Sequence, residues 1–586
     1  MGNDNNNNNN ERIICKLEEK KIIPYNQIAF KKKARPADHL FVLKNIFEKY
    51  LSKGRKVYTC FVDFKKAYDS VWRMGLYYKL IKCGINRNTV KLIKDMYDKT
   101  SQIIKMNGKV TKPLRTQIGV RQGCVLSPRL FNVFLRDLPE IFNQECAPVK
   151  VGTLDVSCLM FADDIVLLSE SKDGLQKSLE KLEKYTEEWD MNVNKKKTKI
   201  MIIQNTGKIP AGDFTYEGQN LEVVECYKYL GTMISRTGSF KLNHAYLKNK
   251  GLKARYAITR NIGLDCKAST IMKLFQKMVE PILLYNCEVA QACIPNSWNE
   301  EKFKIKMWED REIDKVTKGL IRQILGISKK TTNMGIRAEL GKYPLSLNIY
   351  TQMIKYWTRL LSSESILLQE SHLDNLERLK TKKTSWIRTI MFILGACGVK
   401  EIDVDEICKN EHTFHKDIQK KLTDSYKKHW EKEAETMKDG KMAFFLKLKK
   451  SFKFETYLDN IPRSKRRAIT KLRLSCHTLP VEVMRYQKIE RTERKCTICT
   501  NDEVGDEMHY LTSCDHEEMR NSREIFIQKA KSIQPQLKTF DKANLMTYSL
   551  SMNDESIQVE TADFITEMLK IYSNTKDMER NTCAIM

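Results

Sequence analysis

The sequence has no long uninterrupted run of apolar residues. A transmembrane helix needs about 20 mainly apolar residues, and a secretory signal needs a shorter apolar core behind a basic start. No stretch of the chain meets either requirement. We therefore expect no transmembrane segment and a location in the nucleus and cytoplasm.

A disulfide framework is also missing. The chain has 17 cysteines among 586 residues, and most of them stand singly inside apolar runs, as Cys60, Cys158 and Cys287 do. Such spacing is typical of reduced side chains in a reducing compartment.

Acidic residues are scarce relative to basic ones, with 73 Asp and Glu against 102 Lys and Arg, a net charge of +29. Phosphate neutralisation releases counterions, so this excess predicts a nucleic-acid partner, with an anionic membrane surface as the competing explanation. A chain of 586 residues is also too long for a single core, and we expect several domains.

Two adjacent carboxylates, Asp163 and Asp164, stand between two short apolar runs within residues 157–168. This pattern predicts a strand–turn–strand hairpin with the acids at its turn. Neighbouring carboxylates repel each other, and Mg²⁺, which prefers hard oxygen ligands, would offset that repulsion. On this stretch alone, a solvated turn remains the alternative.

A third carboxylate, Asp63, follows a run of β-branched and aromatic residues at 57–62 that predicts a buried strand. A lone acid at a strand end is costly unless it is exposed or paired with a cation. Asp63 is thus the candidate third ligand. Two metal ions about 3.5–4 Å apart on such acids would activate a primer 3′-hydroxyl and hold the leaving pyrophosphate.

Five ordered segments resemble motifs of the reverse transcriptases of non-LTR (LINE-type) retrotransposons: residues 61–69, 121–128, 161–164, 197–198 and 229–231. The resemblance implies an α+β fold of the right-hand polymerase class. Fingers and a palm with an antiparallel sheet would be followed by a helical thumb, a helical connector and a small zinc-knuckle module.

The resemblance also implies residue roles. The catalytic residues would be Asp63, Asp163 and Asp164, which would hold two Mg²⁺ ions, and Lys197, near the pyrophosphate; an exposed charge is the alternative for Lys197. The nucleotide would be contacted by Phe64, Tyr68, Gln122 and Gly123. The primer grip would be Tyr229, Leu230 and Gly231. An aromatic ring at Tyr68 would exclude the nucleotide 2′-hydroxyl, which favours a DNA product.

Near the end of the chain, two cysteines separated by two residues are followed by a histidine and a third cysteine: Cys496, Cys499, His509 and Cys514. This set suits one tetrahedral structural Zn²⁺ with no open coordination position. Cys476, His477 and His516 are rival ligands by their closeness in sequence. The module resembles the C-terminal knuckle of LINE polymerases.

Six segments are expected along the chain. They are a low-complexity leader (1–25), fingers and palm (26–235), a thumb (236–330), a helical connector (331–455), a CCHC zinc-knuckle region (456–525) and a C-terminal tail (526–586). The fingers are short relative to the family, so we expect an N-terminally truncated chain whose endonuclease is supplied by another protein. The last four residues match a prenylation box at Cys583, although a chance ending is the better explanation.

Three functions are compatible with these residues. The first is an RNA-directed DNA polymerase that uses an RNA template, a DNA primer and deoxynucleoside triphosphates. The second is an inactive, truncated or host-recruited RNA-binding remnant. The third is a palm polymerase that makes RNA.

Overall fold

The computed structural model describes residues 11–585 except 12, 18–19, 21, 206, 208–212, 292–296, 382–384 and 400, with side chains up to Lys576. Cys583 of the predicted prenylation box lies outside the described side chains. The chain forms two compact units. Unit 1 comprises Met1–Asn243, Asn286–Phe303 and Gln352–Phe414, and unit 2 comprises His244–Tyr285, Lys304–Thr351 and His415–Met586. Within the described residues, no helix combines the length and apolarity that a bilayer crossing requires.

Unit 1 is built on one five-stranded sheet with the strand order β13-β10-β1-β9-β8. Its strands are β1 (Val57–Val62), β8 (Cys158–Phe161), β9 (Asp164–Ser169), β10 (Lys199–Ile203) and β13 (Glu222–Val223). Neighbouring strands are antiparallel except β10 and β13. The predicted strand at 57–62 and the predicted hairpin around the paired acids are both confirmed.

The remaining strands of unit 1 form two-stranded ribbons. They are β2 (Ser101–Gln102), β3 (Lys105–Met106), β4 (Lys109–Val110), β5 (Leu114–Arg115), β6 (Val149–Val151), β7 (Leu154–Val156), β11 (Thr215–Tyr216), β12 (Gln219–Asn220), β14 (Cys226–Tyr229) and β15 (Thr232–Ser235). The turn between β3 and β4 lies at Asn107 and Gly108, both with positive φ, as the Asn-Gly sequence predicts.

The helices of unit 1 are α2 (Pro36–Leu51), α3 (Arg73–Lys82), α4 (Arg87–Asp98), α5 (Ser127–Phe134), α6 (Lys172–Glu188), α10 (Cys287–Ala290), α15 (Ile366–Lys380), α16 (Trp386–Ala396) and α17 (Val404–Lys409). Helix α3 begins ten residues after Asp63, because residues 65–69 form turns and residue 70 a bend. It ends before Gly84, which has φ +73°.

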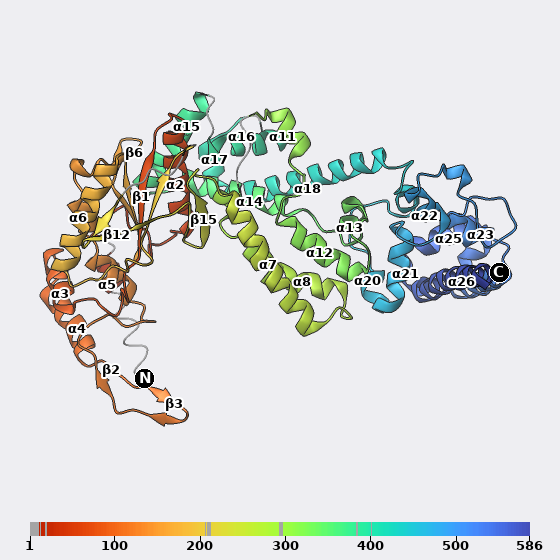
Figure 1. The fold of residues 1–586 in the computed structure, drawn as a ribbon, viewed down its shortest axis with the longest axis horizontal. Helices are drawn as coiled ribbons and strands as arrows, with labels where there is room; N and C mark the ends of the chain where they lie inside the picture. The colour runs from red at the N-terminus through yellow and green to blue at the C-terminus, as the bar shows by residue number, and fades with distance from the viewer. Residues whose placement is uncertain are drawn as a thin grey trace. The chain divides into compact units, whose positions relative to one another are not determined.

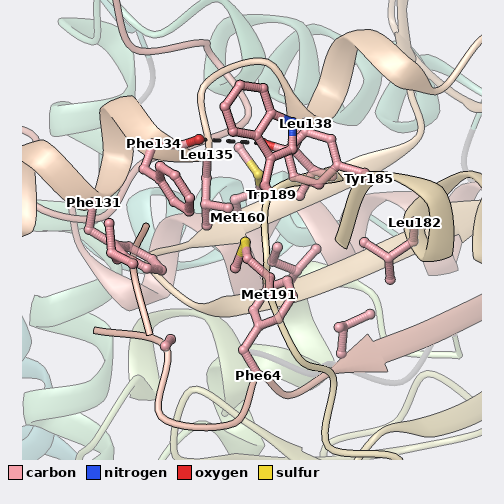
Figure 2. Packing of buried hydrophobic residues seen from close by; sticks show 14 of the residues in the cluster. Phe64, Phe131, Phe134, Leu135, Leu138, Met160, Leu182, Tyr185, Trp189 and Met191 are labelled. Atoms are coloured by element: carbon pink, nitrogen blue, oxygen red, sulfur yellow. Dashed lines mark hydrogen bonds between the residues drawn. The ribbon is translucent and has the colours of Figure 1, made fainter. Parts of the chain in front are cut away.

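One face of the sheet packs against a large apolar core. Alternate strand residues reach this core, among them Cys60, Val62, Met160, Ile165 and Leu167. Helices α3, α5 and α6 supply the other side, and Figure 2 shows their aromatic rings gathered around Met160 and Met191. Because side chains alternate along a strand, Phe61, Asp63 and Asp164 belong to the opposite face.

Residues far along the chain complete unit 1 by packing on α2. Phe41 of α2 meets Trp386 and Tyr356, with ring centroids 5.2 and 5.7 Å apart. Asp38 accepts a hydrogen bond from the Tyr356 hydroxyl at 3.0 Å and pairs with Arg359. Part of the predicted connector therefore belongs structurally to the unit that holds the sheet.

The segment predicted as a leader also contributes to this unit. Ile13, Leu17 and Ile22 are each less than 10% exposed and lie in the same core as the sheet. At least three residues of the predicted leader are therefore packed into the core. Their apolar side chains lie beyond the Asn-rich stretch at residues 3–10, which lies outside the described residues.

Unit 2 is helical. Its helices are α8 (Ala268–Met278), α9 (Glu280–Leu283), α12 (Asp314–Leu325), α13 (Asn333–Glu339), α19 (Ala443–Leu448), α20 (Tyr457–Asn460), α21 (Arg463–Arg473), α22 (Pro480–Tyr486), α23 (Glu507–Thr512), α24 (Glu517–Ile533), α25 (Lys542–Ser551) and α26 (Gln558–Ile585). Four further helices span a unit boundary: α7 (Lys241–Ile262), α11 (Glu300–Lys306), α14 (Leu345–Leu361) and α18 (Glu411–Thr436). Helix α26 packs against both α21 and α24, and Figure 1 shows α21 next to α26.

A buried ionic network holds α13 and α21 of unit 2 together. Arg473 and Glu339 are fully buried, and Arg473 Nε lies 2.7 Å from the Glu339 carboxylate. The same guanidinium reaches Glu455 at 3.2 Å, and Glu455 also pairs with Lys449. The pKa of Arg473 stays raised despite burial, because the neighbouring carboxylates, Glu339 foremost, favour its charge.

Replacing Arg473 with Met is expected to cost about 3–5 kcal/mol of local stability, because it leaves two carboxylates buried beside only one cation. Hydrogen–deuterium exchange of the α21 amides measures this cost. The control is Lys465→Met on the same helix, whose 2.5 Å pair with Asp563 is 40% and 52% exposed and is worth about 0–1 kcal/mol. Equal protection of α21 in both variants would contradict the prediction.

Candidate functional site

Asp63 lies one residue past the end of β1. The turn between β8 and β9 lies at the same end of these strands. The register pairs Val62 of β1 with Ile165 of β9, so the next position places Asp63 across from Asp164. The Asp63 backbone is fixed on its other side, because Asn194 N–H donates to its carbonyl at 2.7 Å. Strand pairing alone therefore brings together carboxylates 101 residues apart in sequence.

The acidic hairpin has a two-residue loop. Phe161 pairs with Asp164 across β8 and β9, which leaves Ala162 and Asp163 in the turn. Ala162 has φ +56°, a left-handed conformation that L-residues with a Cβ seldom adopt. Such strain is typical of functional turns that the surrounding structure holds in place.

Two of the three carboxylates, Asp163 and Asp164, have raised pKa values. Desolvation, and after it the charges of Asp163 and Asp63, raise the pKa of Asp164 to about 6. Desolvation and the charge of Asp63 also raise the pKa of Asp163. Asp164 is nevertheless exposed to solvent, so a cation can reach the group. The arrangement disfavours three free negative charges and suits a multivalent cation.

Lys197 lies beside this group. Its Nζ is 3.8 Å from Asp63 Oδ2, and its side chain is 70% exposed. The sequence left two roles open for Lys197, a position near the pyrophosphate or an exposed charge. The ammonium group is exposed, and it also lies next to Asp63, a predicted metal ligand. The neighbouring Thr198 Oγ1 accepts a hydrogen bond from Asp63 N–H at 3.2 Å.

Tyr68 is half-buried near the acids and stacks on Phe131 of α5, with ring centroids 4.7 Å apart and planes 12° apart. Burial, and after it the charge of Asp163, raise the pKa of Tyr68 to about 12. The ring is thus held rigidly by stacking, which a steric gate requires.

The loop with Gln122 and Gly123 docks on the turn that carries Tyr68. Gln122 Nε2 donates to Asp69 Oδ1 at 2.9 Å, and Val120 N–H donates to the Tyr68 carbonyl at 2.8 Å. Gly123 has φ +79°, and a Cβ there would meet no atom within 4 Å. The structure therefore brings the loop with Gln122 and Gly123 next to the turn that carries Tyr68.

Phe64 differs from the other predicted nucleotide contacts. It is 6% exposed and belongs to the apolar core, where Figure 2 places it near Met191. Its backbone bridges Val193. Its side chain packs the core behind the site in this conformation, so only its backbone is left for the predicted nucleotide contact.

The predicted primer grip forms the hairpin of β14 and β15. Tyr229 pairs with Thr232, and the turn residues Leu230 and Gly231 have φ of +44° and +77°. Tyr229 is 2% exposed, and its hydroxyl lies 3.0 Å from His39 Nδ1. The partly buried turn is therefore anchored by a buried ring.

Sequence reasoning missed two residues that join this hairpin to the acids. Tyr227 stacks on Phe61 of β1 at 4.2 Å, and burial together with the charges of Asp164 and Asp63 raises the pKa of Tyr227 to about 12. His39 meets Phe161 edge-on at 6.0 Å as well as Tyr229. Because side chains alternate along a strand, the sequence could have placed Tyr227 on the same face of β14 as Tyr229. No sequence pattern indicated a role for His39.

A second site lies in unit 2. The ligand atoms of Cys496, Cys499, His509 and Cys514 all lie within 4.8 Å of one another. Tetrahedral Zn²⁺ with Zn–S bonds of about 2.3 Å needs sulfur atoms about 3.8 Å apart, so the cluster requires only small adjustments. Hydrogen bonding from Cys514, and after it from His509, lowers the pKa of Cys496, which favours the thiolate form that zinc binds.

The histidine of the cluster is oriented for metal binding. His509 Nε2 lies 3.3 Å from Cys499 Sγ, and its Nδ1 lies 2.6 Å from the Glu503 carboxylate. A carboxylate on the far nitrogen is the usual arrangement behind a zinc-bound imidazole. The rival ligand His477 faces Glu507 at 3.0 Å instead.

Residues 8–234 match the family described as "Reverse transcriptase (RNA-dependent DNA polymerase)". The RNA-directed DNA polymerase from mobile element jockey of Drosophila funebris is 28% identical over 291 residues, which cover 47% of this chain and 31% of that protein. The Pol polyprotein from type-1 retrotransposable element R2 of Nasonia vitripennis is 28% identical over 222 residues, or 35% and 21% of the two chains.

The chain therefore spans about a third or less of the length of these relatives. Among solved structures, an apo telomerase from Candida tropicalis has a TM-score of 0.30 at 14% identity, covering 62% of this chain and 61% of that one. The match of residues 8–234 to the reverse transcriptase family, together with the observed sheet and its helices, confirms the expected fold class, an α+β right-hand polymerase. The chain thus carries a reverse transcriptase domain of the kind found in the polymerases of non-LTR retrotransposons.

Proposed function

We propose that the chain is the RNA-directed DNA polymerase of a LINE-type retroelement, which adds deoxynucleotides to a primer 3′ end on an RNA template. One observation carries the proposal: strand register gathers Asp63, Asp163 and Asp164 at one edge of the sheet in a domain of the reverse transcriptase family. The net charge of +29 supports a nucleic-acid substrate.

The three carboxylates fit a pair of Mg²⁺ ions, because they supply hard oxygen ligands whose mutual repulsion a cation relieves. Bound there, Mg²⁺ would activate the primer hydroxyl and neutralise charge on the leaving pyrophosphate. Asp63 and Asp163 would hold both ions, and Asp164 would support them. Lys197, 3.8 Å from Asp63, can place a positive charge beside the leaving group.

The surrounding residues would position the substrates. Tyr68, held by its stack on Phe131, would exclude a 2′-hydroxyl, and the loop with Gln122 and Gly123 would shape the same pocket. The turn at Leu230 and Gly231 would place the primer end. In unit 2, the three cysteines and His509 would hold one structural Zn²⁺, whose four protein ligands leave no position for chemistry.

Asp163→Asn is expected to lower primer extension by at least about three orders of magnitude, or about 4 kcal/mol of activation free energy. The assay uses purified full-length chain, Mg²⁺, an RNA template and a DNA primer. The control is Asp173→Asn, an acid at the start of α6. Binding of RNA without extension by the parent chain would select the remnant alternative instead.

Tyr68→Ala is expected to raise ribonucleotide incorporation relative to deoxynucleotide incorporation by at least about tenfold, because the ring that blocks the 2′-hydroxyl is gone. Tyr68→Phe keeps the ring and its stack on Phe131, so its selectivity should match the parent. Single-nucleotide extension with each triphosphate measures the ratio. An unchanged ratio in Tyr68→Ala would rule out the gate, and a parent that accepts only ribonucleotides would select the RNA-synthesising alternative.

The purified chain is expected to contain one zinc per molecule by atomic emission. Cys499→Ser removes a ligand and should release the metal and lower the thermal midpoint of unit 2. Cys476→Ser, outside the cluster, should retain it. Full zinc content in Cys499→Ser, or equal loss from both variants, would contradict the assignment.

A further inference from the structure

Gln27, far upstream of every predicted motif, closes the turn that carries Asp163. Its Oε1 accepts a hydrogen bond from Ala162 N–H at 3.0 Å, and its Nε2 donates to the Ala162 carbonyl at 3.3 Å. One side-chain amide thus holds both backbone polar groups of a single turn residue. Gln27 is fully buried, so water does not compete for these bonds.

The residue held in this way is the strained one. Ala162 has φ +56°, and it directly precedes Asp163 in the two-residue loop. A left-handed conformation at a residue with a Cβ persists only where its surroundings enforce it. A rotation of the Ala162 backbone would redirect the next residue, so the clamp at Ala162 determines where Asp163 points.

The clamp itself is rigidly mounted. Residues 26–28 run parallel to β8, since Met160 N–H donates to the Asn26 carbonyl at 2.9 Å and Ile28 N–H donates to the Met160 carbonyl at 3.2 Å. Gln27 Oε1 also accepts from Ala29 N–H at 3.0 Å, which fixes the amide orientation. These contacts form an isolated parallel β-bridge between Gln27 and Met160, beside the acidic hairpin.

We propose that Gln27 is a positioning residue for the metal-binding carboxylates: its amide holds Ala162 left-handed and thereby fixes Asp163 in its ligating direction. The inference rests on the proposed two-metal polymerase function. A purely structural role, in which Gln27 only satisfies buried backbone groups, would cost stability when removed but would leave metal affinity unchanged.

The chain contains a matched control for that structural role. Gln176 of α6 makes the same clamp on Thr215, accepting from its N–H at 3.0 Å and donating to its carbonyl at 3.2 Å. Thr215 is away from the acidic turn and has no positive φ. Gln176→Met therefore removes an equivalent pair of bonds without touching the carboxylates.

The test measures Mn²⁺ affinity by electron paramagnetic resonance on the full chain, with Asp63→Asn defining the signal from the acidic site. Gln27→Met and Gln27→Leu, whose side chains can neither accept from nor donate to the Ala162 backbone, are expected to weaken Mn²⁺ binding by at least about tenfold. A misplaced ligand of about 1 Å can cost about 10²-fold in turnover, so kcat should fall as well. The Kd for primer–template should stay within about twofold of the parent.

A second substitution separates positioning from loss of fold. Adding Ala162→Gly to Gln27→Met should restore at least part of the Mn²⁺ affinity, because glycine adopts a positive φ without strain. Parent-like Mn²⁺ affinity in both Gln27 variants, equal weakening in Gln176→Met, or no recovery with Ala162→Gly would overturn the proposal. A parent that binds Mn²⁺ but does not extend primers would refute the proposed function while leaving the Mn²⁺ comparison valid.

Discussion

The antiparallel register between β1 and β9 is the constraint on which the catalytic arrangement depends. It places Asp63 across from Asp164, and the two-residue loop then sets Asp163 beside them. Because side chains alternate along a strand, a shift of the β1–β9 pairing by one residue would point Asp63 into the apolar core and Val62 away from it. The core on one face of the sheet therefore fixes the position of the acids on the other.

The face that carries the acids is itself lined with aromatic rings. Phe61 lies two residues before Asp63 and is stacked by Tyr227, while Tyr229 packs nearby and bonds to His39. Phe61 and Tyr229 are themselves buried, and burial is the first cause of the raised pKa values of Asp163 and Asp164. The same rings anchor the hairpin of β14 and β15, so the acids and the predicted primer turn share one rigid support.

Local patterns in the sequence were sufficient for the elements that carry the chemistry. Apolar runs broken by acids predicted β1, β8 and β9, and the spacing of cysteines and histidine predicted the zinc cluster that the structure assembles. The pairing of Asp63 with the hairpin depended on the order of motifs in a known family. Local sequence patterns cannot predict this contact, because it joins segments about a hundred residues apart.

The sequence did not reveal contacts made by residues without a pattern of their own. Neither Gln27 nor His39 belongs to any of the motifs recognised in the sequence, yet both are fully buried. Phe64 is the opposite case, since its place in a motif predicted a nucleotide contact while its side chain packs the core. Burial of a polar side chain is decided by tertiary pairing, which composition and periodicity do not encode.

The passage of the chain between the two units has a consequence for synthesis on the ribosome. Unit 1 ends only at Phe414, and α2 needs partners that arrive late, such as Asp374, 329 residues after Asn45. At about 5–20 residues per second, roughly 15–65 s separate the emergence of these partners. During that interval the part of α2 that packs against α15, Tyr356 and Trp386 is without these partners, so unit 1 can complete its packing only after the returning segment has been made.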